Sequence, residues 1–177
     1  TIENDTIIGL STSLPSDWCA VVYSGDQTRN NNINILNNEI INGSIGINFQ
    51  GYHTTIPDVS IRIYNNQIYD FSAYGIRIVY LDSVNICLNE MYSKSNGGYS
   101  TQYGIYCSGC DNSSIISRNK IQVNGSSSNY GMYFHACDGI TGDEILVANN
   151  FVVTKNATST VYGIHPTSST HFKIYHN

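Results

Sequence analysis

The chain has 177 residues, of which 41% are hydrophobic and 12% are charged, and its formal net charge is −5. This apolar content is enough to build a core, so general disorder is excluded, and the length is consistent with one domain spanning 1–177. The eight Lys and Arg residues are scattered, which excludes the basic stripe of a nucleic-acid-binding protein, and no apolar run approaches the ~20 residues that span a bilayer.

A repeated pattern runs along the chain, and its clearest copy is the stretch 59–82. This copy begins with an alternating apolar run at Ile61 and continues with an Asn pair at 65–66. A second apolar run opens at Ile68, and a third opens with Tyr-Gly-Ile at 74–76. Each copy of the pattern therefore predicts three short strands.

An Asn precedes the second apolar run in nearly every copy. In chain order this column consists of Asp5, Asn38, Asn66, Asn89, Asn119, Asn150 and Asn177. We expect each Asn to occupy a left-handed corner between two strands, because Asn tolerates that conformation best among non-glycine residues. We also expect the stacked side chains to hydrogen-bond to one another as an asparagine ladder.

The third apolar run opens with a Gly followed by an apolar residue, and Tyr precedes four of these steps. The steps are Gly46-Ile47, Gly75-Ile76, Gly104-Ile105, Gly131-Met132 and Gly163-Ile164, with Ala20-Val21 in the same place in the first copy. The distance from each Asn to the next step varies, which predicts one loop of variable length per copy.

The fold class follows from the absence of any apolar stripe at helical spacing and from the many β-branched and Tyr residues. Short strands in repeats of this length cannot each bury an apolar face alone, so the repeats must stack on one another. The sequence predicts an all-β parallel β-helix of about six turns with three short strands per turn. One wall of its core is expected to contain Ile33 and Ile35, Ile61 and Ile63, Val84 and Ile86, Ile145 and Val147, and Phe172 and Ile174.

The repeat "I-x-I-x-N-N-x-I … Y-G-I" resembles that of the right-handed parallel β-helix superfamily, the pectate-lyase-like fold, over nearly the whole chain. The resemblance implies a right-handed coil in which the strand after the Gly step lines a groove. It leaves the function open, because polysaccharide lyases and hydrolases, viral tailspikes, adhesins and structural rods share this repeat.

If alternate residues of that strand point outward, they form one exposed column. Its members are expected to be Asn48, Gln50, Arg77, Val79, Tyr106, Ser108, Tyr133, His135, His165 and Thr167. Aromatic rings pack against the apolar faces of sugars while amides and guanidinium groups hydrogen-bond to hydroxyls, so Asn48, Gln50, Arg77, Tyr106, Tyr133, His135 and His165 are the candidate carbohydrate-binding residues. The alternative is an ordinary exposed sheet face, where Tyr and β-branched residues are common.

A catalytic role is the second interpretation of the same column. The resemblance implies that a β-eliminating enzyme would need a base, and Arg77, Tyr133, His135 and His165 are the candidates. The same resemblance implies that a hydrolase would carry closely spaced pairs of Asp in the groove, and the exposed column contains no Asp. The lyase signature Trp-x-Asp-His is also missing, since the single Trp is Trp18.

Two further sets of residues are expected to stack at one corner. Asp82, Asp111 and Asp138 either bind Ca²⁺ together or each hydrogen-bond their own backbone as turn residues, and the turn interpretation is preferred. Cys110 and Cys137 would be close enough for a disulfide, although Leu81 in the same column favours a role as apolar filler.

The sequence as a whole predicts an extracellular or surface-exposed β-helix that binds a glycan or serves as an adhesin or structural rod. The alternatives are a polysaccharide lyase or glycoside hydrolase acting in the groove, and a tailspike-like receptor-binding protein. Five Asn-x-Ser/Thr sequons accord with an exterior location, at Asn4, Asn42, Asn112, Asn124 and Asn156. The chain begins and ends inside repeats, so we expect either a longer natural protein or self-association, end to end or as a trimer.

Overall fold

The computed structural model describes residues 1–11, 19–25, 31–51, 58–95 and 100–177, which form three parallel β-sheets. Sheet A contains seven strands: β1 (Ile2–Glu3), β4 (Ile33–Leu36), β7 (Asp58–Tyr64), β10 (Leu81–Cys87), β13 (Ile115–Ser117), β16 (Ile145–Ala148) and β19 (Phe172–Tyr175). Sheet B contains six: β2 (Thr6–Ile8), β5 (Glu39–Ile41), β8 (Gln67–Phe71), β11 (Glu90–Ser93), β14 (Lys120–Val123) and β17 (Phe151–Thr154). Sheet C also contains six: β3 (Ala20–Gly25), β6 (Ile45–Gln50), β9 (Tyr74–Val79), β12 (Thr101–Ser108), β15 (Ser128–His135) and β18 (Val161–Thr167).

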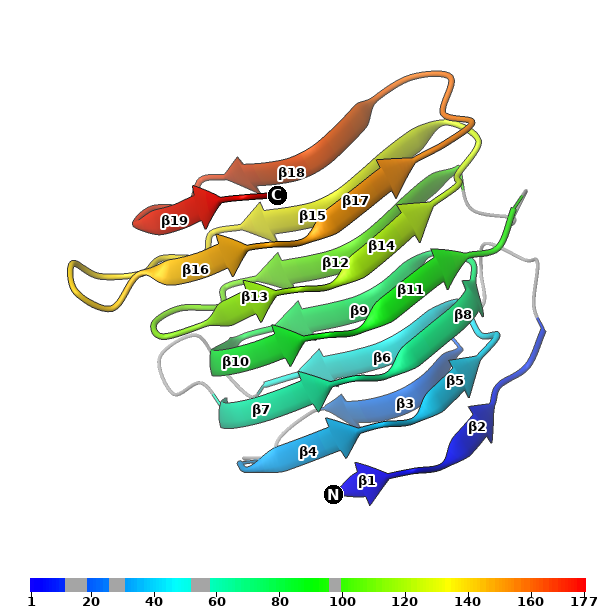
Figure 1. Cartoon of the computed structure of the whole chain (residues 1–177), viewed down its shortest axis with the longest axis horizontal. Helices are drawn as coiled ribbons and strands as arrows, with labels where there is room; N and C mark the ends of the chain where they lie inside the picture. The colour runs from blue at the N-terminus through cyan, green and yellow to red at the C-terminus, as the bar shows by residue number, and fades with distance from the viewer. Residues whose placement is uncertain (12–18, 26–30, 52–57, 96–99) are drawn as a thin grey trace.

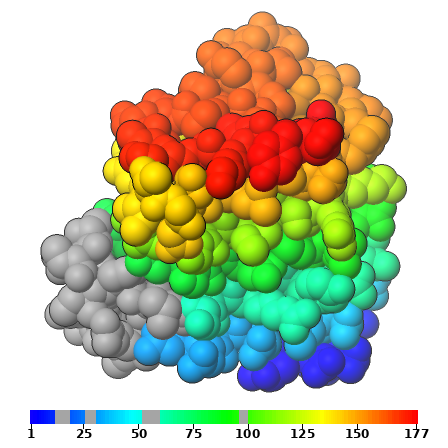
Figure 2. All heavy atoms as spheres, turned by 60° about the vertical axis from the view of Figure 1, so that its left-hand side comes forward, coloured from blue at the N-terminus to red at the C-terminus, as the bar shows by residue number. Residues whose placement is uncertain are grey.

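The chain visits the sheets in the order A, B, C and then starts the next turn, so every strand pairs in parallel with its counterpart one turn away. In Figure 1 the chain climbs from β1 to β19, with the nearer strands running to the right and the farther strands returning to the left, which is a right-handed coil. The turns form successive layers in Figure 2. The expected parallel β-helix is confirmed, with about five turns where the sequence predicted about six.

The predicted core wall lies on the inner face of sheet A. Ile33 pairs with Ile61, and Ile35 pairs with Ile63, so apolar side chains of successive turns meet. Most members of the wall are buried, and Ile63 is completely inaccessible to solvent. Ile33 and Phe172 are half-buried. Ile174 is exposed over 40% of its surface, because β19 has a neighbouring strand of sheet A on one side only.

The predicted asparagine column forms a continuous ladder of hydrogen bonds inside the corner between sheets A and B. The side-chain amide and the backbone amide of each Asn donate to Oδ1 of the Asn one turn later. The participants are Asn38, Asn66, Asn89, Asn119, Asn150 and Asn177, and the Nδ2–Oδ1 distances are 2.8 to 3.0 Å. At the first turn, the backbone amide of Asp5 donates to Asn38 Oδ1. The ladder satisfies polar groups that would otherwise be buried without partners.

The expectation that the ladder residues occupy the left-handed corner is wrong. The residue before each ladder position has the positive φ instead, between 55° and 60°: Asn4, Asn37, Asn65, Leu88, Arg118, Asn149 and His176. Asn37 is exposed whereas Asn38 is buried. The left-handed residue therefore bends the chain outward, and the following Asn turns its side chain into the corner.

Replacing one ladder residue should destabilise the whole solenoid. Asn89 Nδ2 donates to the carbonyl of Ile63 and to Asn119 Oδ1, and Asn89 Oδ1 accepts from Asn66. Asn89→Ala leaves these buried groups unpaired, so we expect it to lower the free energy of unfolding by about 3 kcal/mol.

Urea denaturation followed by far-UV circular dichroism measures this loss. Gln122→Ala is the control, because Gln122 lies at an outward, half-buried position in sheet B and should change stability by less than about 0.5 kcal/mol. Equal stability of the Asn89→Ala variant and the wild type would contradict a stabilising ladder.

Candidate functional site

The outward face of sheet C brings most of the sequence-predicted site residues into one vertical column. Asn48 pairs with Arg77, and Arg77 pairs with Tyr106. Tyr106 then pairs with Tyr133, and Tyr133 pairs with His165. These five residues are therefore neighbours in five consecutive turns.

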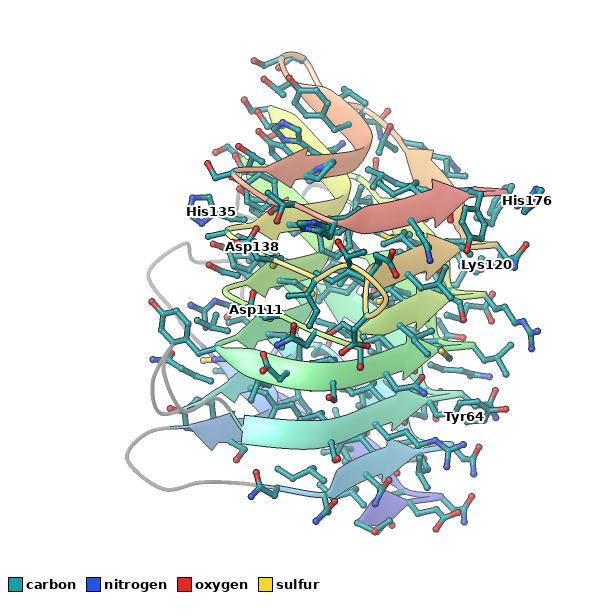
Figure 3. All side chains as sticks on the ribbon, turned by 90° about the vertical axis from the view of Figure 1, so that its left-hand side faces the viewer. Tyr64, Asp111, Lys120, His135, Asp138 and His176 are labelled. Atoms are coloured by element: carbon teal, nitrogen blue, oxygen red, sulfur yellow. The ribbon has the colours of Figure 1, made fainter. Side chains whose placement is uncertain are left out.

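Gln50 and His135 belong to a second outward column, two residues farther along each strand. Val79 and Ser108 separate them in that column, so Gln50 and His135 are not neighbours. His135 is exposed and projects away from the body of the molecule in Figure 3. The structure thus divides the predicted column into two, one from Asn48 to His165 and one from Gln50 to Thr167. The prediction that every member is exposed is wrong for Asn48 and Val79, which are buried, with 8% and 7% of their surfaces accessible to solvent.

Arg77 is fixed at the centre of the contiguous column. Its Nη1 donates to Asn48 Oδ1 at 2.9 Å, and its guanidinium lies 5.9 Å from the centre of the Tyr106 ring. A hollow of about 650 Å³ extends from Arg77 and Gln50 toward Tyr23 in the first turn. Amide and guanidinium groups therefore line one half of this face.

The other half of the face is aromatic, and a second column of tyrosines accounts for most of it. Tyr74, Tyr103, Tyr130 and Tyr162 stack one turn above another. The ring centres of Tyr74 and Tyr103 are 4.9 Å apart, and those of Tyr103 and Tyr130 are 4.8 Å apart. The sequence shows Tyr before these Gly steps, but strict alternation would have turned the Tyr side chains inward.

The glycine of each step explains why the tyrosines face outward. Gly104 and the following Ile105 are both buried, so alternation is interrupted at this point. A Cβ on Gly104 would lie 2.2 Å from Ile121 Cγ2 and 2.6 Å from the carbonyl oxygen of Gly131. Only glycine allows the strand to approach sheet B this closely, and the irregularity leaves Tyr103 on the outer face.

The first turn departs from the predicted alignment by one residue. Ala20 pairs with Ile45, which precedes Gly46, and Val22 pairs with Ile47. Ala20-Val21 is therefore not equivalent to Gly46-Ile47, as the sequence alignment assumed.

The two aromatic columns touch each other and form one surface, which we call the tyrosine surface. It consists of Tyr74, Tyr103, Tyr106, Tyr130, Tyr133, Tyr162 and His165. The ring of Tyr103 meets those of Tyr106 and Tyr133 nearly at right angles, and Tyr162 stacks on His165 at 4.1 Å. His165 Nδ1 is buried and has no hydrogen-bond partner among the described residues.

Burial raises the pKa of two phenols on this surface. The pKa of Tyr103 is raised well above its ordinary value, first because burial disfavours the phenolate and then because neighbouring tyrosines oppose a second negative charge. The pKa of Tyr133 is raised for the same reasons. These hydroxyls can both donate and accept hydrogen bonds.

The three corner aspartates stack as expected, but they do not cap their own turns. Asp82 Oδ1 accepts the backbone N–H of Asp111 at 3.1 Å, and Asp111 Oδ1 accepts that of Asp138 at 2.7 Å. The carboxylates of Asp82 and Asp111 therefore each link one turn to the next, and Asp111 and Asp138 follow one another at this corner in Figure 3. Burial raises the pKa of Asp82, although the Asp111 amide opposes the shift. The described residues include no group of three or more His, Cys, Asp or Glu arranged to hold a metal ion, and Ca²⁺ at this corner stays a prediction.

The five cysteines are free thiols. Cys110 and Cys137 are stacked as predicted, with the Cys110 backbone N–H donating to Cys137 Sγ at 3.4 Å, and both side chains are buried. Burial raises the pKa of the Cys110 thiol, so it is a poor nucleophile. Cys110 and Cys137 therefore fill positions in the core that small apolar residues could occupy.

The class defined by this architecture is the parallel β-solenoid with an asparagine ladder and a tyrosine-covered sheet. Comparison with protein families, with curated proteins and with solved structures finds no match for the chain. The described part of the chain contains no helix long and apolar enough to cross a membrane.

Two equivalent glycines test how the tyrosines are positioned. Gly104→Ala should lower the free energy of unfolding by about 2 to 3 kcal/mol, because the new methyl group overlaps Ile121 and the Gly131 carbonyl. Gly163→Ala is the matched control, since a Cβ there meets nothing within 4 Å, and it should be nearly neutral. Thermal unfolding measures stability, and near-UV circular dichroism reports on the tyrosine rings. Similar effects of the two substitutions would contradict this explanation.

Alkaline pH should destabilise the protein through Tyr103. The unfolded chain releases the phenolic proton near pH 10, whereas the folded chain holds it to higher pH. The contribution of Tyr103 to the free energy of unfolding is therefore fully present below about pH 10 and declines as the pH rises further. We expect Tyr103→Phe to lose less stability than the wild type above pH 10, as measured by urea denaturation at several pH values. Identical pH profiles of the two proteins would refute the raised pKa.

Proposed function

We propose that the protein binds carbohydrate on the outer face of sheet C, along the tyrosine surface. The observation that carries the proposal is a column of tyrosines stacked over four consecutive turns, Tyr74, Tyr103, Tyr130 and Tyr162, which touches the second column of Tyr106, Tyr133 and His165. This surface lies next to the Arg77–Asn48 hydrogen bond. An aromatic surface flanked by amides and a guanidinium group is suited to sugars, which have apolar ring faces and many hydroxyl groups. A glycan ligand accords with a location outside the cell or on a cell surface, which is part of the proposal.

The repeat of the solenoid favours a linear, repeating ligand. The tyrosine rings stack within each column, so adjacent turns offer equivalent aromatic edges and phenol groups about 5 Å apart. A polymer with one sugar unit per turn would make the same contacts again at every turn. Repeated weak contacts of this kind raise the affinity for a chain above that for a single sugar.

The residues of sheet C favour glycan binding without cleavage. The described strands of sheet C contain no Asp or Glu, so the carboxylate pair used by most glycoside hydrolases is missing there. Tyr133 is a poor general base at neutral pH, because its pKa is raised and not lowered. We therefore propose an adhesive or glycan-binding role for this face.

The central test removes two half-buried rings from the tyrosine surface. The double variant Tyr106→Ala/Tyr133→Ala should bind glycans at least about tenfold more weakly than the wild type, because both rings of the outer column are lost. The matched control is Tyr69→Ala/Tyr92→Ala, which removes a similar pair of neighbouring rings from sheet B. A glycan array identifies ligands, and isothermal titration calorimetry then gives Kd for each variant.

Three outcomes separate the alternatives. Loss of binding in the sheet C variant alone supports the proposal, whereas equal binding by both variants overturns it. Release of new reducing ends or unsaturated products by the wild type, abolished by His165→Ala, would replace binding by catalysis. Each variant is first compared with the wild type by circular dichroism, so that loss of fold is recognised.

A further inference from the structure

A second, smaller hollow adjoins the tyrosine surface where the chain passes from sheet B to sheet C. It lies at the start of β6, β9 and β12, in three consecutive turns, and has a volume of about 200 Å³. The residues that line it include Ser44, Ala73, Tyr74, Ser100, Thr101 and Tyr103. Two members of the tyrosine surface thus form one wall of this hollow.

The lining has both kinds of group that a sugar ring requires. Tyr74 and Tyr103, stacked at 4.9 Å, contribute aromatic surface, and Ala73 adds a buried methyl group. Ser100 and Thr101 contribute hydroxyls, and neither hydroxyl has a hydrogen-bond partner among the described residues. Ser44 is different, because its Oγ already accepts the backbone N–H of Cys19 at 2.8 Å.

The size of the hollow limits what it can hold. Pockets for drug-sized ligands measure roughly 300–1,000 Å³, and this hollow is smaller. It therefore fits one sugar unit and not a longer segment of a glycan. The rest of a bound chain would lie outside, on the tyrosine surface.

The charge of the lining indicates which sugars fit. Among the lining residues, Ser, Thr, Ala, Ile and Tyr, none carries a charge at neutral pH, and burial raises the pKa of Tyr103. Lys94 comes from the same corner region but is not part of the lining, and its Nζ donates to Ser11 Oγ at 3.4 Å. A carboxylate or sulfate in the hollow would lose hydration without gaining a cationic partner, which is unfavourable.

We propose that this hollow is a subsite for a single neutral sugar unit, either a one-residue branch or the end of a chain, on the glycan that sheet C binds. The inference rests on the proposed carbohydrate binding and adds the ligand class: a glycan with a neutral branch or terminus. Sheet C provides the extended contact, and the hollow distinguishes a branched or terminal unit from an unbranched interior one.

Filling the hollow tests the subsite without altering the tyrosines. Ser100→Trp places a large ring in the hollow from an exposed position, and the Ser100 carbonyl, which accepts from Ser127 and Ser128, is unchanged. Ser126→Trp is the matched control, because Ser126 is also exposed at this corner and does not line the hollow. Both variants and the wild type are assayed on arrays of paired glycans with and without one neutral branch or terminal hexose.

We expect the wild type and Ser126→Trp to prefer the branched or terminated member of each pair. Ser100→Trp should lose that preference, with about tenfold weaker binding of the preferred glycans and unchanged binding of their plain partners. Methyl hexosides at high concentration should compete with the preferred glycans, and glucuronic acid should not.

The outcomes distinguish this subsite from the proposed function. Glycan binding that Ser100→Trp leaves unchanged overturns the subsite while carbohydrate binding stands. Competition by glucuronic acid as strong as that by the hexosides overturns the neutral ligand class. Absence of binding to any glycan by the wild type overturns the proposed function and the subsite with it.

Discussion

The buried asparagine ladder is the interaction on which the rest of the structure depends. Parallel strands of two to eight residues still bury the same face after a slip of two residues, because side chains alternate with a period of two. The ladder removes this ambiguity, because the buried amide of each Asn is satisfied in one register only. Asn89, for example, accepts from the side-chain amide of Asn66 and donates to the carbonyl of Ile63. Once Asn66, Asn89 and Asn119 are aligned, the strands of sheets A and B that flank them are aligned as well.

A second constraint places the tyrosines on the outer face of sheet C. The glycines that open the strands of sheet C let the backbone approach sheet B, and the interrupted alternation turns the preceding tyrosines outward. Direct pairing of β9, β12 and β15 sets the vertical spacing, so Tyr74, Tyr103 and Tyr130 come into ring contact. Core packing and surface chemistry are therefore consequences of the same repeat.

The residues on the outer face of sheet C change from one end of the solenoid to the other. Asn48 and Arg77 stand in the earlier turns where Tyr106 and Tyr133 stand in the later ones, so one end of the column is polar and the other is aromatic. The small hollow at the corner lies beside the boundary between these halves. A uniform solenoid would offer a polymer the same contacts at every position, whereas the outer face of sheet C differs from turn to turn.

The sequence by itself determined the fold class, the ladder and the inner wall of sheet A, because each depends on a residue type that recurs once per turn. It also placed Arg77, Tyr106, Tyr133 and His165 in one column, since strict alternation holds after the glycine step. Only the tertiary structure decided that Tyr74 and its counterparts face outward, because that depends on how closely Gly75 approaches the neighbouring sheet. The left-handed corner residues and the links between corner aspartates were likewise decided by contacts between turns, which no single stretch of sequence contains.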